Sequence, residues 1–99
     1  MQITKKELEE KTFYVKPVGR LDINTVPEFQ KELADVATNY NNLIIDFSEV
    51  NFISSIGLRV LLEMHKAMSE KGSMKLTNVS FDIMYIFNMT GFNKILNIE

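Results

Sequence analysis

A short apolar run, "NLIIDF" from Asn42 to Phe47, is followed closely by the amphipathic stretch "SSIGLRVLL". An apolar run of this length that ends in an aspartate is typical of a strand in a sheet covered on both faces. Strands of that kind are joined by crossover helices, and an amphipathic segment after the strand favours such a connection. The pair predicts an α/β fold with a mixed or parallel sheet.

Two further strands are predicted near the N-terminus, at residues 3–8 and 13–18, joined by a polar turn around Glu10 and Lys11. Pro17 lies in the second of these strands and has no backbone N–H to donate to a neighbour. We therefore expect the second strand to lie away from the interior of the sheet.

A helix is predicted over residues 24–40. Thr25 and Glu28 have the spacing of a capping box, and Pro27 falls in the first turn, where proline is tolerated. Apolar residues recur at helical spacing along one side, which must pack on another apolar surface. These residues are Val26, Phe29, Leu33, Val36, Ala37 and Tyr40.

The second half of the chain is predicted to begin with a helix from Ser54 or Ser55 to about Lys71, with Gly72 as its left-handed end. A strand is predicted next at 73–79, followed by Ser80 as an N-cap and a short, largely buried helix at 81–89. Residues 91–99 are predicted to form a final strand or an irregular tail. Strands thus alternate with helices along the chain, as the α/β class requires.

The charge balance and the absence of cysteine exclude several kinds of function. The chain carries 11 Lys and Arg against 13 Asp and Glu, which argues against binding nucleic acid through its phosphates. Without cysteine there are no disulfides and no thiolate metal sites. The N-terminal segment is charged, and no apolar run approaches the roughly 20 residues that span a bilayer. We expect a single domain, residues 1–99, that is cytoplasmic and not inserted in a membrane.

The two serines in "NFISSIGLRVLL" stand where an apolar, extended run gives way to the predicted helix. Helical spacing puts Gly57 on the core side and Ser55 on the solvent side with Arg59. Ser54 or Ser55 could act as the N-cap. A helix N-terminus also favours an anion, so a phosphoryl group on Ser55 would be tolerated there.

Two features near these serines admit a structural or a binding interpretation. Ile56 and Leu62 flank the solvent side, where they are covered by a neighbouring loop or edge a partner surface. The stretch "GRLD", ending at Asp22, is a turn toward the helix or presents a loop carboxylate at a binding edge.

No catalytic residue, metal ligand or cofactor site is expected. His65 is the only histidine and lies ten residues beyond Ser55 on the same predicted helix, about 15 Å away by rise and on another side. The serines also lack the leading glycine of the G-x-S-x-G motif. One imidazole without matching ligands makes a poor metal site, so His65 is interpreted as a packed residue.

The order of these elements and the stretch "LIIDFSEVNFISSIGLRVLL" resemble the STAS family, specifically the bacterial anti-sigma-factor antagonists. The family pattern is a buried strand ending in Asp, a V-x-F-[ILM] stretch, and then Asp-Ser-[Ser/Thr]-Gly-[Leu/Ile] opening a helix. Asp46, Val50, Phe52 and Ile53 match its first part, and residues 54–58 occupy the last. The resemblance implies an α/β STAS fold, with one mixed sheet of four to five strands and three to four helices.

The resemblance also implies a function, which is partner switching rather than catalysis. The unmodified protein would bind an anti-sigma factor that is also a serine kinase, and so free a sigma factor. Phosphorylation at Ser55 would end that binding, and a PP2C-type phosphatase would reverse it. We expect six partner-binding residues: Asp22, which matches the family's G-x-[IL]-D carboxylate; Ser54, Ile56, Gly57 and Leu58 of the serine motif; and Arg59 on the solvent side of the helix.

Two positions depart from the family pattern. Ser54 stands where the family usually has Asp, and Ile56 stands where it usually has Ser or Thr. A constitutive STAS interaction subunit of a transporter or signalling complex, without phosphoregulation, is therefore the alternative function. A domain that binds a nucleotide or another small ligand is a third possibility, which no Gly-rich phosphate loop supports.

Overall fold

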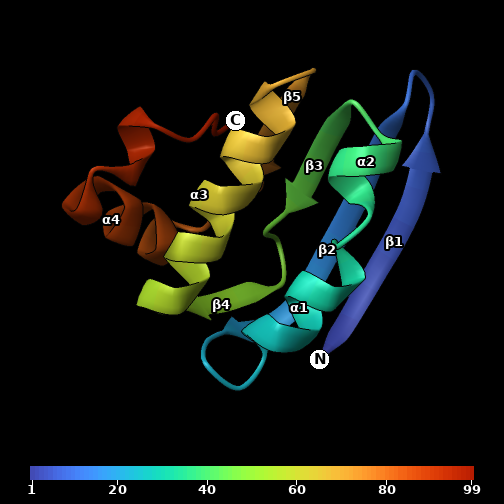
Figure 1. Ribbon diagram of the computed structural model, residues 1–99. Helices are drawn as coiled ribbons and strands as arrows, with labels where there is room; N and C mark the ends of the chain where they lie inside the picture. Colours follow the sequence, from blue (N-terminus) through green and yellow to red (C-terminus); the bar gives the residue numbers. More distant parts are fainter.

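The computed structural model describes residues 1–99 and contains five strands, four α-helices and one short 3₁₀-helix (Figure 1). The elements, in chain order, are β1 Gln2–Leu8, β2 Thr12–Leu21, α1 Val26–Glu32, α2 Val36–Asn39, β3 Asn42–Asp46, β4 Val50–Ile53, α3 Ser55–Ser69, β5 Ser73–Thr77, α4 Phe81–Thr90 and the 3₁₀-helix Phe92–Lys94. The predicted α/β class with one mixed sheet is confirmed.

The sheet has the order β1-β2-β3-β5, and β4 pairs with the far end of β2. Only β1 runs antiparallel to its neighbour, while β2, β3, β4 and β5 are parallel. The interior position of β2 contradicts the expectation drawn from Pro17. That residue lies between the part of β2 that pairs with β3, ending at Val15, and the part that pairs with β4, beginning at Gly19. Pro17 has no N–H to donate, but at this position no hydrogen bond to β3 or β4 is lost.

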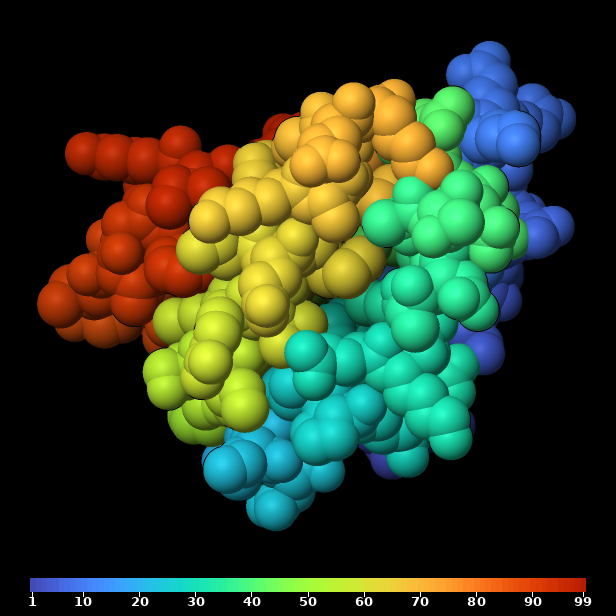
Figure 2. Space-filling model, viewed as in Figure 1, coloured from blue at the N-terminus to red at the C-terminus, as the bar shows by residue number.

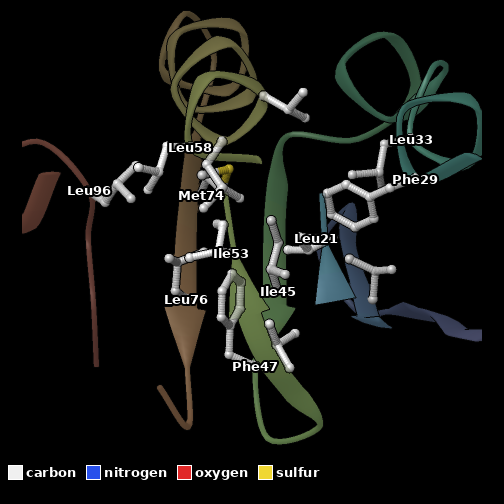
Figure 3. Close-up of a cluster of buried hydrophobic side chains, with 14 of the residues drawn as sticks. Leu21, Phe29, Leu33, Ile45, Phe47, Ile53, Leu58, Met74, Leu76 and Leu96 are labelled. Carbon is white, nitrogen blue, oxygen red and sulfur yellow. The ribbon is translucent and has the colours of Figure 1, made fainter. Parts of the chain in front are cut away.

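Helices α1, α2 and α3 cover one face of the sheet, and α4 lies beside α3 and β4 (Figure 1). Leu43 and Ile45 of β3 point to the covered face and are buried, whereas Ile44 points to the other face and is half-buried. The prediction that both faces of β3 are covered is thus wrong. One continuous cluster of apolar side chains joins sheet and helices, with Phe29 and Leu33 meeting Leu21 and Ile45 (Figure 3).

The predicted helix over 24–40 is broken into α1 and α2. Leu33 shares its N–H between the carbonyls of Phe29 and Gln30, a tightening of the last turn that ends α1. Thr25 occupies the N-cap position, yet its side chain makes no capping bond. The hydroxyl donates instead to the Arg20 carbonyl at 2.6 Å, so the predicted capping box does not form.

Two other predicted helix ends have different outcomes. Gly72 follows α3, but its backbone is not left-handed. A Cβ there would lie 1.8 Å from the Asn41 carbonyl oxygen, so glycine is required by close packing rather than by conformation. The predicted cap of α4 is confirmed, because the Ser80 hydroxyl accepts a hydrogen bond from Ile83 N–H at 3.2 Å. The tail is mostly irregular, and its backbone pairs with the sheet only at the bridge between Leu76 and Ile98.

Candidate partner-binding surface at the start of α3

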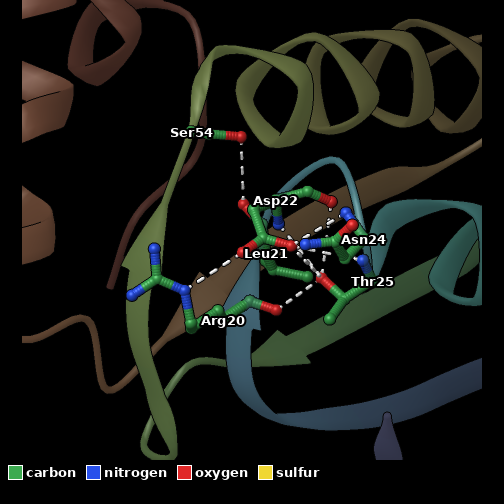
Figure 4. A network of polar contacts seen from close by, with 6 residues as sticks. All are labelled: Arg20, Leu21, Asp22, Asn24, Thr25 and Ser54. Carbon is green, nitrogen blue, oxygen red and sulfur yellow. Dashed lines mark hydrogen bonds and ion pairs between the residues drawn. The ribbon is translucent and has the colours of Figure 1, made fainter.

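The parallel pairing of β2 and β4 brings two segments far apart in sequence to one edge of the sheet. Leu21 pairs with Ile53, so the residues that follow them, Asp22 and Ser54, lie side by side (Figure 4). Gly19 precedes this edge with a φ of 104°, at an irregularity where β2 shifts register against β4. A side chain would strain that backbone conformation, so the glycine is needed to turn β2 into the pairing.

Ser54 attaches the start of α3 to the end of β2. Its N–H and its hydroxyl both donate to the Leu21 carbonyl, at 2.9 and 3.3 Å. Ser54 has the extended backbone of an N-cap residue, but its side chain does not cap the helix. Neither serine therefore caps α3 through its hydroxyl, because that of Ser54 is directed to β2 and Ser55 is already the first helical residue.

Ser55 is exposed and stands at the N-terminus of the longest helix of the protein. The first turn of α3 contains no acidic residue, and no side chain caps it. The solvent side of α3 continues through Arg59 and Glu63, both exposed, as the helical spacing predicts. The environment of the Ser55 hydroxyl thus combines solvent access with the partial positive charge of a helix N-terminus.

Gly57 and Leu58 lie beneath this surface rather than on it. A Cβ on Gly57 would lie 2.7 Å from Cγ1 of Ile53 and 2.9 Å from the Leu21 carbonyl oxygen. Leu58 is 7% exposed and belongs to the core. The two residues hold α3 close to the ends of β2 and β4, so any contribution of theirs to binding is indirect.

Ile56 and Leu62, the two apolar flanks of α3, are both half-buried. Ile56 packs against the core and lines a shallow cavity of about 280 Å³ between α1 and α3, together with Gln30, Arg59, Val60 and Glu63. The part of Ile56 that remains exposed therefore lies at the rim of a hollow next to Ser55.

Asp22 is bound within its own loop. One carboxylate oxygen accepts from Nε of Arg20 at 3.0 Å, and the other accepts from the N–H groups of Asn24 and Thr25 at 3.0 and 3.3 Å. The Arg20 hydrogen bond, together with those from the two backbone N–H groups, lowers the pKa of Asp22 below its usual value. The side chain is 15% exposed, so the carboxylate shapes the loop and offers little surface to a partner.

Two residues of this surface were not among the predicted partner-binding residues. Ile23 is 71% exposed in the loop between β2 and α1. Arg20 packs its guanidinium over the Phe52 ring, 4.2 Å from the centroid. An isoleucine between Asp22 and Asn24 in a turn was the only available signal, because the contact between Arg20 and Phe52 depends on the pairing of β2 with β4.

No other part of the molecule offers a site with comparable chemistry. No group of three His, Cys, Asp or Glu side chains is placed to hold a metal ion. His65 is half-buried, and its Nδ1 has no hydrogen-bond partner. None of the helices has the length and apolar character needed to span a bilayer.

Several characterised proteins resemble this chain. The anti-sigma-B factor antagonist of Bacillus subtilis (strain 168) is 29% identical to this chain. The match covers 91% of this chain and 84% of that protein. The fold of this chain matches the crystal structure of an anti-sigma factor antagonist from Mycobacterium paratuberculosis, with a TM-score of 0.84, 22% identity and coverage of 98% of this chain and 85% of that one.

The fold also matches the anti-sigma factor antagonist SpoIIAA, solved unphosphorylated and phosphorylated, with TM-scores of 0.82 and 0.76 at 17% identity. Both matches cover 99% of this chain, together with 88% of the unphosphorylated and 91% of the phosphorylated SpoIIAA chain. An antagonist is a regulatory binding protein, in line with the expectation that the chain is not an enzyme. The family model of the STAS domain matches residues 3–99. The chain therefore belongs to the STAS domain family.

Proposed function

We propose that this protein is an anti-sigma-factor antagonist that works in the cytoplasm by partner switching. Its unphosphorylated form binds an anti-sigma factor with serine-kinase activity, and the sigma factor is thereby released. The kinase phosphorylates Ser55, and the phosphorylated protein dissociates. The relatives that carry the antagonist name cover nearly the whole chain, which supports the role.

The observation that carries the proposal is the different placement of the two adjacent serines. The Ser54 hydroxyl is directed at the Leu21 carbonyl on the inner side of the turn. Ser55 is exposed on the outer side, at the first position of α3. A kinase approaching this surface would thus find one accessible hydroxyl, and the product would sit where a helix N-terminus favours an anion.

Phosphorylation would change the charge of this surface. A phosphoserine adds about −1.5 to −2 charges at neutral pH. Arg59 lies one turn along the same exposed side, so it is at the spacing where side chains of a helix can pair. The added charge, and the engagement of Arg59 by it, would oppose a partner that binds the unmodified surface.

The partner-binding surface that we propose is centred on Ser55 and Arg59, with Ile56 at its apolar rim and Ile23 and Arg20 on the adjacent loop. These side chains are exposed or half-buried. Ser54, Gly57, Leu58 and Asp22 support this surface from below or from within the loop. A separate PP2C-type phosphatase would restore the unmodified form by removing the phosphoryl group.

The direct test incubates the protein with candidate anti-sigma kinases from the same genome and ATP, and maps the modified residue by mass spectrometry. We expect labelling at Ser55 that is abolished in Ser55→Ala. Ser54→Ala is the matched control, because it removes the neighbouring hydroxyl without removing the acceptor, and it should remain labelled.

Binding measurements on the same variants separate the proposal from the constitutive alternative. Ser55→Ala should bind the kinase, and Ser55→Asp should bind it poorly. Equal binding by Ser55→Ala and Ser55→Asp, without labelling by any candidate kinase, would instead identify a constitutive interaction subunit. Ser54 in the place of the usual family carboxylate is the feature that favours this second function.

A further inference from the structure

Helix α4 has two apolar sides, only one of which is covered. Ile83 and Phe87 are buried, and the Phe87 ring lies 6.1 Å from that of Phe47 between ring centroids. On the other side Phe81, Tyr85 and Met89 are 86%, 60% and 70% exposed. The prediction that this helix is largely buried is therefore wrong.

The three exposed residues are spaced by four positions and form one stripe along the helix. Single exposed apolar residues are normal on a protein surface, but a contiguous set of large ones marks a contact surface. Ile95, which follows the helix, is 46% exposed as well. We define the α4 stripe as Phe81, Tyr85 and Met89.

We propose that the α4 stripe joins two copies of this chain, packed antiparallel about a twofold axis. Such an interface is self-complementary, because the same surface is used by both copies. With Tyr85 at the axis, Phe81 of each copy meets Met89 of the other, since both lie one helical turn from Tyr85. Phenylalanine and methionine make favourable sulfur–aromatic contacts.

The charges around α4 favour a second copy in this orientation. Asp82 and Lys94 are the only charged residues between Ser80 and Ile98, one at the start of the helix and the other just after its end. An antiparallel pair brings the acidic end of each helix toward the basic end of the other, and it also opposes the two helix dipoles. A parallel pair would bring like charges together.

The position of α4 leaves the α4 stripe accessible to another molecule. The helix forms the outer edge of the protein on the side away from β1, beyond α3 (Figures 1 and 2). The α4 stripe exposes on the order of 400 Å², whereas a stable interface buries about 800 Å² on each partner. We therefore expect a weak dimer in the micromolar range, which forms and dissociates with concentration.

Sedimentation velocity of the full chain, from low micromolar to near-millimolar concentration, tests the proposal. The wild-type protein should shift from monomer to dimer, and Tyr85→Lys should raise the dissociation constant at least ~30-fold, as expected for the central residue of an interface. Leu8→Lys is the matched control, because it adds the same charge at an exposed leucine on β1 and should leave the dimer intact.

The charged residues provide a second test that does not depend on the apolar contacts. Lys94→Glu should weaken the dimer, and the double variant Asp82→Lys with Lys94→Glu should recover most of the loss. A protein that stays monomeric at the highest concentration would overturn the proposal, as would a Tyr85→Lys variant that dimerises like the wild type. If the wild type is monomeric and Tyr85→Lys weakens binding to the kinase, the α4 stripe belongs to that partner instead. None of these outcomes depends on phosphorylation of Ser55.

Discussion

Two aspartates lie at the ends of neighbouring parallel strands of the sheet. The carboxylate of one accepts hydrogen bonds from distant segments of the chain, and that of the other only from its own loop. Asp46, at the end of β3, accepts from the Tyr14 hydroxyl at 2.5 Å, from Nδ2 of Asn78 at 3.0 Å and from the Ser48 N–H at 2.9 Å. Its partners come from β2, from its own turn and from the segment after β5. The carboxylate of Asp22, just past the end of β2, accepts hydrogen bonds only from residues 20–25.

This difference in hydrogen-bond partners predicts different structural roles for Asp46 and Asp22. Asp46 is 8% exposed and links segments that are far apart in sequence, so its carboxylate stabilises the whole fold. Burial works against its ionisation, but the hydrogen bonds from Tyr14, Asn78 and Ser48 outweigh this and lower its pKa to about 2. Asp22 orders one loop at the edge of the proposed partner surface. An aspartate at the end of a strand can thus stabilise either the whole fold or one loop, depending on which segments supply its hydrogen-bond donors.

The largest effect is expected for Asp46→Asn. The substitution removes the charge from a buried group with three donors, and we expect a loss of about 3 kcal/mol in the free energy of unfolding. Urea denaturation followed by circular dichroism measures it. Asp22→Asn is the comparison variant, and a loss for Asp22→Asn as large as that for Asp46→Asn would contradict the assignment of roles.

The pH dependence of stability should follow the Asp46–Tyr14 pair. Because the pKa of Asp46 is lowered to about 2, its contribution is complete above its ordinary pKa of 3.8 and is lost as the pH falls toward 2. The hydrogen bond to Asp46, followed by burial and the nearby negative charge, raises the pKa of Tyr14 to about 12, so the neutral phenol is favoured and this contribution is lost as the pH rises from 10 toward 12.

We expect the acid-side loss to reach about 2 kcal/mol, measured by chemical denaturation across the pH range. The matched control is Asp46→Asn, in which the part of the acid loss due to this residue should disappear. An acid profile that is the same in both proteins would show that Asp46 is not responsible.

Tyr14→Phe should have a smaller effect, about 1 kcal/mol, because Asp46 keeps two of its three donors. Thermal unfolding of the variant and of the wild type at neutral pH gives the difference. In the double variant with Asp46→Asn, the additional loss should be less than the sum of the single losses. Simple additivity would indicate that the two side chains act independently.

Asp22→Asn should affect stability least and binding most among these variants. Its donors lie in one loop, and that loop carries Ile23 and Arg20 at the proposed surface. We expect affinity for the anti-sigma kinase to fall by about tenfold, as for a displaced interface contact, with little change in the unfolding midpoint. Calorimetric titration with the kinase checks the affinity. An unchanged affinity would show that this loop is not part of the partner-binding surface.

The strand and helix sequence patterns predicted the main elements because they depend on local periodicity. The apolar run ending at Asp46 and the amphipathic stretch after Ser54 both lie where they were expected. The order of the strands in the sheet was harder to predict from the sequence, because strands that pair are far apart along the chain. Pro17 gave the wrong position for β2, since its cost depends on where β3 ends and β4 begins along that strand.

The candidate site was predictable in outline but not in its contacts. The side of α3 that carries Ser55 and Arg59 follows from helical spacing alone. The direction of the Ser54 hydroxyl does not, because its acceptor is the carbonyl of Leu21, 33 residues earlier in the chain. The exposure of α4 was also missed, since a helix with two apolar sides gives no sign of which side the core leaves uncovered.

The most direct test of the account compares the affinity of the protein for its anti-sigma kinase before and after stoichiometric phosphorylation of Ser55. Because about −1.5 to −2 charges would be added at the centre of the contact surface, we expect the affinity to fall at least ~100-fold. Treatment with a PP2C-type phosphatase should restore it. Equal affinity of the two forms, each confirmed by mass spectrometry, would contradict partner switching at Ser55.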